Sequence, residues 1–208
     1  MKLFWWRKNA LPIRPRGEET GREAAAPVDR LFLDRWSPRA FLPEPLPAET
    51  ARILFEAARW SPSCFNEQPW LFVYAADPAG REKILGTLNE GNRAWARNAP
   101  ILAVLFARRK FGDDGELNRW AGFDCGAAWM SLALEARLLG LYAHAMGGFS
   151  RESAHSISAV PEDQFDAMCV IAVGKRGDPA LLPENFRARE KANSERKLPG
   201  EIALPVST

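Results

Sequence analysis

Apolar residues recur along this chain at two spacings, one typical of helices and one typical of strands. Helical spacing over residues 48–60, followed by Pro62, predicts an amphipathic helix with one buried face. Asp77 and Pro78 form a cap and first-position pair that predicts the start of another helix. Short apolar runs predict four buried strands, of which the first is expected in the middle of a sheet, at residues 70–74, 101–106, 141–146 and 168–173.

The segment 124–139 is apolar around most of its circumference. Asp124 stands where a helix cap is expected, and Gly140 stands where the helix should end. Such a helix must be covered on all sides, and it would span roughly 24 Å. We expect a second subunit to cover part of it, with burial inside one subunit as the simpler alternative.

Predicted strands alternate with predicted helices, which indicates an α/β or α+β domain with helices packed on a central sheet. Residues 1–27 are rich in Arg, Glu, Pro and Ala without a hydrophobic period, so we expect a flexible leader there. We expect a single domain over residues 28–208. Its end, residues 175–208, is polar and contains prolines, which is typical of an arm rather than of another layer.

Composition narrows the possible partners and the compartment. The 28 basic and 26 acidic residues nearly balance, so no overall field favours nucleic acid or an acidic membrane surface. No uncharged apolar run has the length of a membrane span. The three cysteines are widely spaced and accompanied by two histidines, which fits neither a disulfide framework nor a zinc site. We therefore expect a cytoplasmic protein with no nucleic-acid or membrane partner and no metal.

The stretch Ser61–Trp70 joins the first predicted helix to the first predicted strand. It holds small hydroxyl side chains and an amide between two prolines. Ser and Asn can hydrogen-bond a flat polar heterocycle while the prolines hold the backbone still, so the stretch suits a ligand-facing turn. An ordinary helix-to-strand connection would have the same composition, and the residues alone favour neither interpretation.

Together with Arg35-Trp36-Ser37-Pro38-Arg39-Ala40-Phe41, this turn resembles the opening of the nitroreductase family of FMN-dependent oxidoreductases. The resemblance implies an α+β nitroreductase-like fold, with a central mixed sheet flanked by helices, in an intertwined homodimer. It implies FMN as cofactor and NAD(P)H as electron donor. The implied reaction reduces a small-molecule acceptor, such as a nitroaromatic, a quinone or a related conjugated compound, in a ping-pong cycle through flavin N5.

The resemblance assigns the phosphate and ribityl end of FMN to Arg35, Ser37 and Arg39. A basic pair near the C-terminus, Arg196 and Lys197, joins them. Arg supplies planar paired donors that match phosphate oxygens, so these residue types suit the role.

Two alternatives stay open for these basic residues. Without the resemblance, both arginines of the motif would be surface residues that pair with Asp34 or Glu44. The C-terminal pair is uncertain by a residue, because Arg187 and Arg189 lie nearby in the sequence.

The resemblance assigns the flavin ring to three parts of the chain. The Pro-Ser turn reaches the ring from the opposite subunit, two glycines at a strand end lie near N5, and an amide in a polar segment contacts the ring. A simple turn role is equally consistent with that last amide. The residues are Pro62, Ser63, Cys64 and Asn66 in the turn, Gly147 and Gly148 at the strand end, and Asn92 in the polar segment.

No side chain stands out as a nucleophile or general base, as expected if FMN carries the chemistry. Cys64 could act as a redox thiol, although an inert packed thiol is the favoured interpretation. Trp95, Phe111 and Trp120 fall where the family lines its substrate mouth, and we expect core packing for at least one of them. Alternative functions are a flavin-fragmenting or reductive dehalogenating member of the family, and a non-catalytic flavin-binding module.

Overall fold

The computed structural model describes residues 20–112, 115–192 and 194–206. Their centre is a four-stranded sheet with the order β1-β2-β4-β3, in which every neighbouring pair is antiparallel. The strands are β1 (Trp70–Ala75), β2 (Ile101–Arg108), β3 (Tyr142–Met146) and β4 (Phe165–Gly174).

The mixed sheet that we expected is therefore wrong for the described strands. β2 and β3 run in the same direction, but β4 lies between them and is antiparallel to both. The crossover from β2 to β3 through α6 thus skips one strand position, which β4 then fills.

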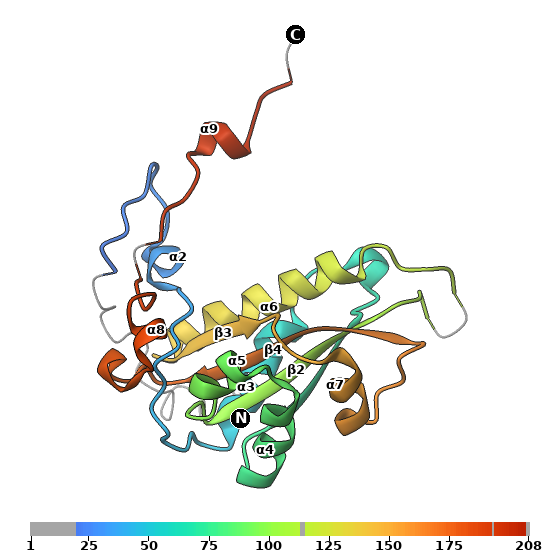
Figure 1. The fold of residues 1–208 in the computed structure, drawn as a ribbon. Coiled ribbons are helices and arrows are strands. Elements are labelled where there is room, and N and C mark those ends of the chain that lie inside the picture. Colours follow the sequence, from blue (N-terminus) through green and yellow to red (C-terminus); the bar gives the residue numbers. More distant parts are fainter. Residues whose placement is uncertain (1–19, 113–114, 193, 207–208) are drawn as a thin grey trace, which may run out of the picture.

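Helices cover both faces of this sheet (Figure 1). α3 (Glu49–Arg59) and α6 (Ala121–Leu138) pack together on one face. The other face carries α4 (Pro78–Thr87), α5 (Glu90–Ala96) and α7 (Arg151–Ser158). Short elements complete the fold: α2 (Arg30–Asp34), α8 (Glu184–Arg187), α9 (Pro199–Ile202) and the 3-10 turns η1 (Cys64–Asn66) and η2 (Pro179–Leu181).

β2 divides the core between the two helical layers. Its residues alternate in direction, as in any strand. Leu102 and Val104 pack towards α4, α5 and α7, whereas Ala103 and Leu105 pack towards α3 and α6. The buried strand predicted at residues 101–106 is confirmed and extends to Arg108.

β1 was expected in the middle of the sheet, and this expectation is wrong, because β1 lies at one edge. Leu71 is 37% exposed and Tyr74 is 50% exposed, although both belong to an apolar run. An apolar run indicates contact with other groups but does not say whether a strand has one neighbour or two.

Asp124 does not cap α6, since that helix begins three residues earlier with Trp120 as its N-cap. Asp124 lies in the first turn with a side chain that is 3% exposed. The predicted helix end is confirmed, because Gly140 adopts a φ of 74° directly after the C-cap. Glycine takes this left-handed conformation without steric cost.

Apolar side chains remain exposed on α6 and on the chain after α8. Phe123 and Met130 of α6 are 79% and 42% exposed. Beyond α8, the arm runs past α2 and extends away from the sheet with α9 (Figure 1). Exposed apolar residues follow it outward: Leu198, Ile202, Leu204 and Val206.

Candidate functional site

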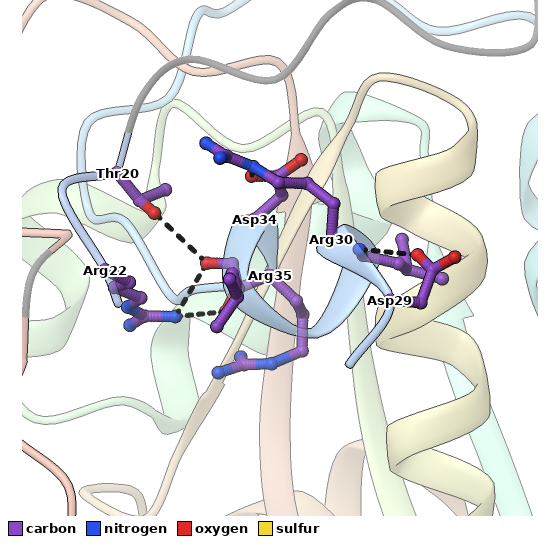
Figure 2. A network of polar contacts seen from close by, with 8 residues as sticks. Thr20, Arg22, Asp29, Arg30, Asp34 and Arg35 are labelled. Carbon is purple, nitrogen blue, oxygen red and sulfur yellow. Dashed lines mark hydrogen bonds and ion pairs between the residues drawn. The ribbon is translucent and has the colours of Figure 1, made fainter. Parts of the chain in front are cut away.

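Arg35 ends α2 and belongs to a group of neighbouring arginines. Burial lowers the pKa of Arg35, and the nearby charge of Arg196 lowers it further. Arg22, from the segment before α2, lies beside the same helix end (Figure 2). Thus the structure brings Arg35 and Arg196 together, although 160 residues separate them in the sequence.

The carboxylates that could have paired with the motif arginines are engaged elsewhere. Asp34 accepts a hydrogen bond from Arg30 at 2.9 Å, and Glu44 accepts one from Lys175 at 2.8 Å. The alternative in which Arg35 and Arg39 pair with these two carboxylates is therefore wrong.

The backbone around Ser37 and Arg39 is held by two residues from distant elements. His144 of β3 donates from Nδ1 to the carbonyl of Pro38 at 2.9 Å. The Glu190 carboxylate accepts the backbone N–H groups of Arg39 and Ala40 at 2.8 and 3.0 Å. The Arg39 guanidinium itself lies 5.9 Å from the centre of the Phe186 ring. Hence the C-terminal segment fixes the motif backbone through Glu190.

The two residues of the C-terminal basic pair, Arg196 and Lys197, have different environments. Arg196 donates to the Ser194 hydroxyl at 2.7 Å and to the Glu195 carbonyl at 2.8 Å. Lys197 is exposed. Of the two, Arg196 is the one whose charge reaches Arg35.

Gly148 follows β3 and is enclosed by two asparagines. Its carbonyl accepts the Asn92 side-chain amide at 3.1 Å and the Asn89 backbone N–H at 3.1 Å. A Cβ on Gly148 would lie 2.3 Å from Asn89 Nδ2 and 2.7 Å from Asn92 Nδ2. By contrast, a Cβ on Gly147 would meet no atom within 4 Å. The structure thus brings together the predicted Asn92, Gly147 and Gly148 and adds Asn89.

Two hydrogen bonds anchor the turn at residues 61–68 to α6. Ser61 and Ser131 join through their hydroxyls at 2.7 Å, and the Cys64 N–H donates to the Asp124 carboxylate at 3.1 Å. Within the turn, the Ser63 hydroxyl accepts the Gln68 N–H at 3.0 Å. Pro62 at its start is exposed.

The same turn has an unusual backbone. Phe65, Asn66 and Gln68 have φ values of 51°, 59° and 50°. Residues other than glycine adopt positive φ values at a steric cost, which is smaller for Asn than for most residues. Such residues occur often at functional sites. A plain connection between a helix and a strand has no need of this conformation.

The turn and the Gly148 group lie at opposite edges of the sheet. The turn leads into β1, and Gly147 leaves β3, with β2 and β4 between these strands. Three strand spacings of about 4.8 Å separate the two edges by roughly 14 Å. Among the described residues, no hydrogen bond or ion pair joins the turn to the Gly148 group or to the arginine group.

The three aromatic residues expected at a substrate mouth have different environments. Trp95 is 1% exposed and packs against Phe41 and His144, so it belongs to the core. Trp120 is 57% exposed. Phe111 contacts the ring of the exposed Phe65 edge-on, with centroids 6.0 Å apart.

Cys125 is buried and Cys169 is partly buried. Burial raises the pKa of the Cys125 and Cys169 thiols to about 12, which keeps both protonated and unreactive. Within residues 20–112, 115–192 and 194–206, no group of His, Cys, Asp and Glu side chains could hold a metal ion. None of the helices described there is long and apolar enough to cross a membrane.

A protein-family model and several known proteins match this chain in sequence. The protein-family model described as Nitroreductase family matches residues 33–93 and 86–175. A Streptomyces coelicolor protein, provisionally named an NADH dehydrogenase/NAD(P)H nitroreductase, is 27% identical over 181 residues, which are 78% of this chain and 91% of the relative.

Solved structures give the same result. A crystal structure described as an oxidoreductase containing FMN is 38% identical, with a TM-score of 0.85 over 90% of this chain and 96% of its own. A Desulfovibrio desulfuricans protein, provisionally named a nitroreductase and solved in complex with FMN, is 22% identical, with a TM-score of 0.67 over 89% of this chain and 99% of its own. The second likeness concerns the fold alone. With the family model matching well over half of the chain, this protein belongs to the nitroreductase family.

Proposed function

We propose that this chain reduces nitroaromatic, quinone or related conjugated acceptors with NAD(P)H. Its general class follows from its family and relatives: it is an FMN-dependent NAD(P)H oxidoreductase. The acceptors and the ping-pong order of the reaction are the proposed part.

The observation that carries the proposal is the arginine group at the end of α2. Burial, followed by the charges of Arg196 and Arg35, lowers the pKa of Arg22, and burial, followed by the charge of Arg196, lowers the pKa of Arg35. The nearby Asp34 is paired with Arg30. A phosphate dianion placed there would relieve this repulsion and accept paired guanidinium hydrogen bonds. The group therefore fits the phosphate end of FMN, with Ser37 and Arg39 on the adjoining backbone and Lys197 next to Arg196.

The Gly148 group fits the flat ring. A side chain on Gly147 would meet no atom within 4 Å, so a planar ligand can approach the backbone there. Asn92, which bonds to the neighbouring Gly148 carbonyl, would be a polar neighbour of that ligand. The chemistry that FMN supplies when bound is reversible hydride transfer at N5, from NAD(P)H and then to the acceptor. The residues of the chain bind and orient the reactants.

We further propose an intertwined homodimer in which Pro62, Ser63, Cys64 and Asn66 serve the FMN site of the partner. Within one chain, the turn and the Gly148 group are roughly 14 Å apart across the sheet. Phe123 and Met130 on α6, together with the apolar residues of the arm, offer the exposed surface that a second copy could cover.

An aromatic acceptor suits the exposed surface beside the turn. Phe65 is 88% exposed and is steadied by the edge of Phe111. The Glu67 carboxylate, which accepts the Gly112 N–H at 3.0 Å, links the two segments that carry these rings. Exposed rings of this kind can stack on planar aromatic compounds.

The test of the cofactor site compares two ligands that differ only in the phosphate. The purified protein should be yellow and should release FMN on denaturation. Arg39→Ala should weaken FMN binding roughly ten- to a hundredfold, as expected for the loss of a charge-assisted bond, and should change riboflavin binding far less. Equal loss of both ligands would assign Arg39 to the fold instead.

The reaction order is tested by steady-state kinetics. Rates measured against NAD(P)H at several acceptor concentrations should give parallel reciprocal plots, because donor and acceptor occupy the site in turn. Intersecting plots would contradict the ping-pong cycle. A panel of nitroaromatic, quinone and enone acceptors under anaerobic conditions would then identify the preferred class.

A further inference from the structure

Arg22 connects three parts of the chain through one guanidinium group. Its Nη1 donates to the carbonyls of Leu33 at 3.2 Å and Arg35 at 2.6 Å, both at the end of α2 (Figure 2). On the arm, Nε donates to the Ala192 carbonyl at 2.6 Å, and Nη2 donates to the Ser194 hydroxyl at 3.1 Å. The segment before α2 thereby ties the helix end to a part of the arm some 170 residues away.

The segment that carries Arg22 is itself held in place. The Thr20 hydroxyl donates to the Leu33 carbonyl at 3.3 Å, and Thr20 is only 5% exposed. Residues 20 and 22 fall in the leader that composition indicated would be flexible, yet both are bonded to the body of the protein.

Arg22 lies near two other positive charges, those of Arg196 and Arg35. The four acceptors that Arg22 has among the described residues are neutral oxygens, so none of them offsets its charge. The Ser194 hydroxyl that accepts from Arg22 also accepts from Arg196 at 2.7 Å. Burial lowers the pKa of Arg22, followed by the charges of Arg196 and Arg35. Holding these like charges together costs free energy, which an anion would recover.

We propose that Arg22 is a positioning residue that clasps the arm at Ala192 and Ser194 to the end of α2 and so holds Arg196 beside Arg35 for the phosphate monoester of FMN. This inference rests on the function proposed above. A preformed pair binds phosphate more tightly than two arginines on independent segments, because the arm need not be ordered when the ligand arrives. The role requires the planar fork of Arg, since its two edges meet carbonyls on different segments.

The first test measures FMN and riboflavin affinities of the full-length apoprotein. Arg22→Ala should weaken FMN binding at least tenfold and riboflavin binding less than twofold. Arg22→Lys keeps the charge but not the fork, so it should recover less than half of the loss on a logarithmic scale. The matched control is Arg52→Ala, which removes an exposed arginine of α3 that pairs with Glu49. It should leave both affinities unchanged.

The second test needs neither cofactor nor activity. Amide hydrogen exchange of peptides covering residues 188–197 reports whether the arm stays docked in the apoprotein. Exchange should become at least tenfold faster in Arg22→Ala than in the natural protein or Arg52→Ala, while peptides of β2 should exchange at the same rate in all three.

Each contrary outcome has a definite meaning. Equal weakening of FMN and riboflavin by Arg22→Ala, or unchanged exchange of the arm, would overturn the clasp. If Arg22→Lys bound FMN as tightly as the natural protein, the positive charge of residue 22 would explain its role, and the clasp would be wrong. If the natural protein bound no FMN at all, the proposed function would fail, whereas the exchange experiment would still decide whether Arg22 docks the arm.

Discussion

The carboxylate of Asp124 accepts the backbone N–H of Cys64 at 3.1 Å, and this bond joins the first turn of α6 to the turn at residues 61–68. Asp124 is almost fully buried. The largely apolar helix α6 therefore fixes the loop that we propose reaches FMN, and any shift of α6 would be transmitted to Cys64.

Removing this acceptor should destabilise the protein. Asp124→Ala leaves the Cys64 N–H without its partner, which should cost about 1–3 kcal/mol of unfolding free energy in urea denaturation. Asp124→Asn keeps an acceptor oxygen, so its cost should stay below about 1 kcal/mol, largely from the lost interaction with the helix dipole. Equal costs for the two variants would show that the charge matters and the hydrogen bond does not.

The two glycines after β3 should respond differently to alanine. In Gly148→Ala the new Cβ would lie 2.3 Å from Asn89 Nδ2, and both asparagine amides are held by hydrogen bonds to this region. We expect a loss of about 1–3 kcal/mol. Gly147→Ala meets open space and should stay within about 0.5 kcal/mol of the natural protein. Thermal unfolding of the apoproteins measures both, and a well-tolerated Gly148→Ala would show that the asparagines can move aside.

His144 should make stability depend on mildly acidic pH. Burial lowers the pKa of His144 to about 4 from an ordinary value of 6.5. The unfolded chain therefore binds a proton that the folded one does not between these values, so this contribution is complete above pH 6.5 and is lost as the pH falls towards 4. The pKa difference corresponds to a loss of at most about 3 kcal/mol of unfolding free energy. The actual loss should be smaller, because the side chain is only partly buried.

The matched variant for this prediction is His144→Gln, whose amide can still donate to the Pro38 carbonyl but does not titrate. Urea denaturation at pH 7.5 and pH 5 should show a larger drop for the natural protein than for the variant. The same drop in both would mean that other groups cause it.

Sequence reasoning located the regular elements because their signals are local. The helix predicted at residues 48–60 is α3, one residue shorter at each end, and Asp77 caps α4 as a side-chain acceptor. The edge position of β1 could not be read in this way. It depends on which strands pair, and pairing is decided by contacts far apart in the sequence.

Some residues of the candidate site had a local sequence signal, and others did not. The motif pointed to Arg35 and Arg39 as candidates, whereas Arg22 has no recognisable spacing and acquires its acceptors on Ala192 and Ser194 only when the arm folds back over 170 residues. Asn89 could have been found, because an Asn three residues before Asn92 at the start of a helix is typical of an N-cap. His144 carried no signal, since a lone histidine in a strand is usually a core residue.

The shared site makes the most specific prediction. Arg39 lies on the segment after α2, and Ser63 lies in the turn before β1. If the turn serves the partner's site, these two residues of one chain belong to different FMN molecules. Arg39→Ala should weaken phosphate binding, and the bulky Ser63→Trp should obstruct the ring. Each homodimer should therefore be nearly inactive at an FMN concentration too low to fill the damaged sites.

Mixing the two variants separates the possible arrangements. In a heterodimer with exchanged turns, one site receives both changes and the other receives neither, so one of the two sites is restored. Co-expression with two affinity tags, followed by sequential purification, should give a heterodimer with about one FMN and about half the activity of the natural dimer. If both residues served the same site within one chain, each site would keep one change and the heterodimer would stay colourless. A chain that remains monomeric yet binds FMN would contradict the shared site as well, because the restored activity depends on a turn that only a second copy can supply.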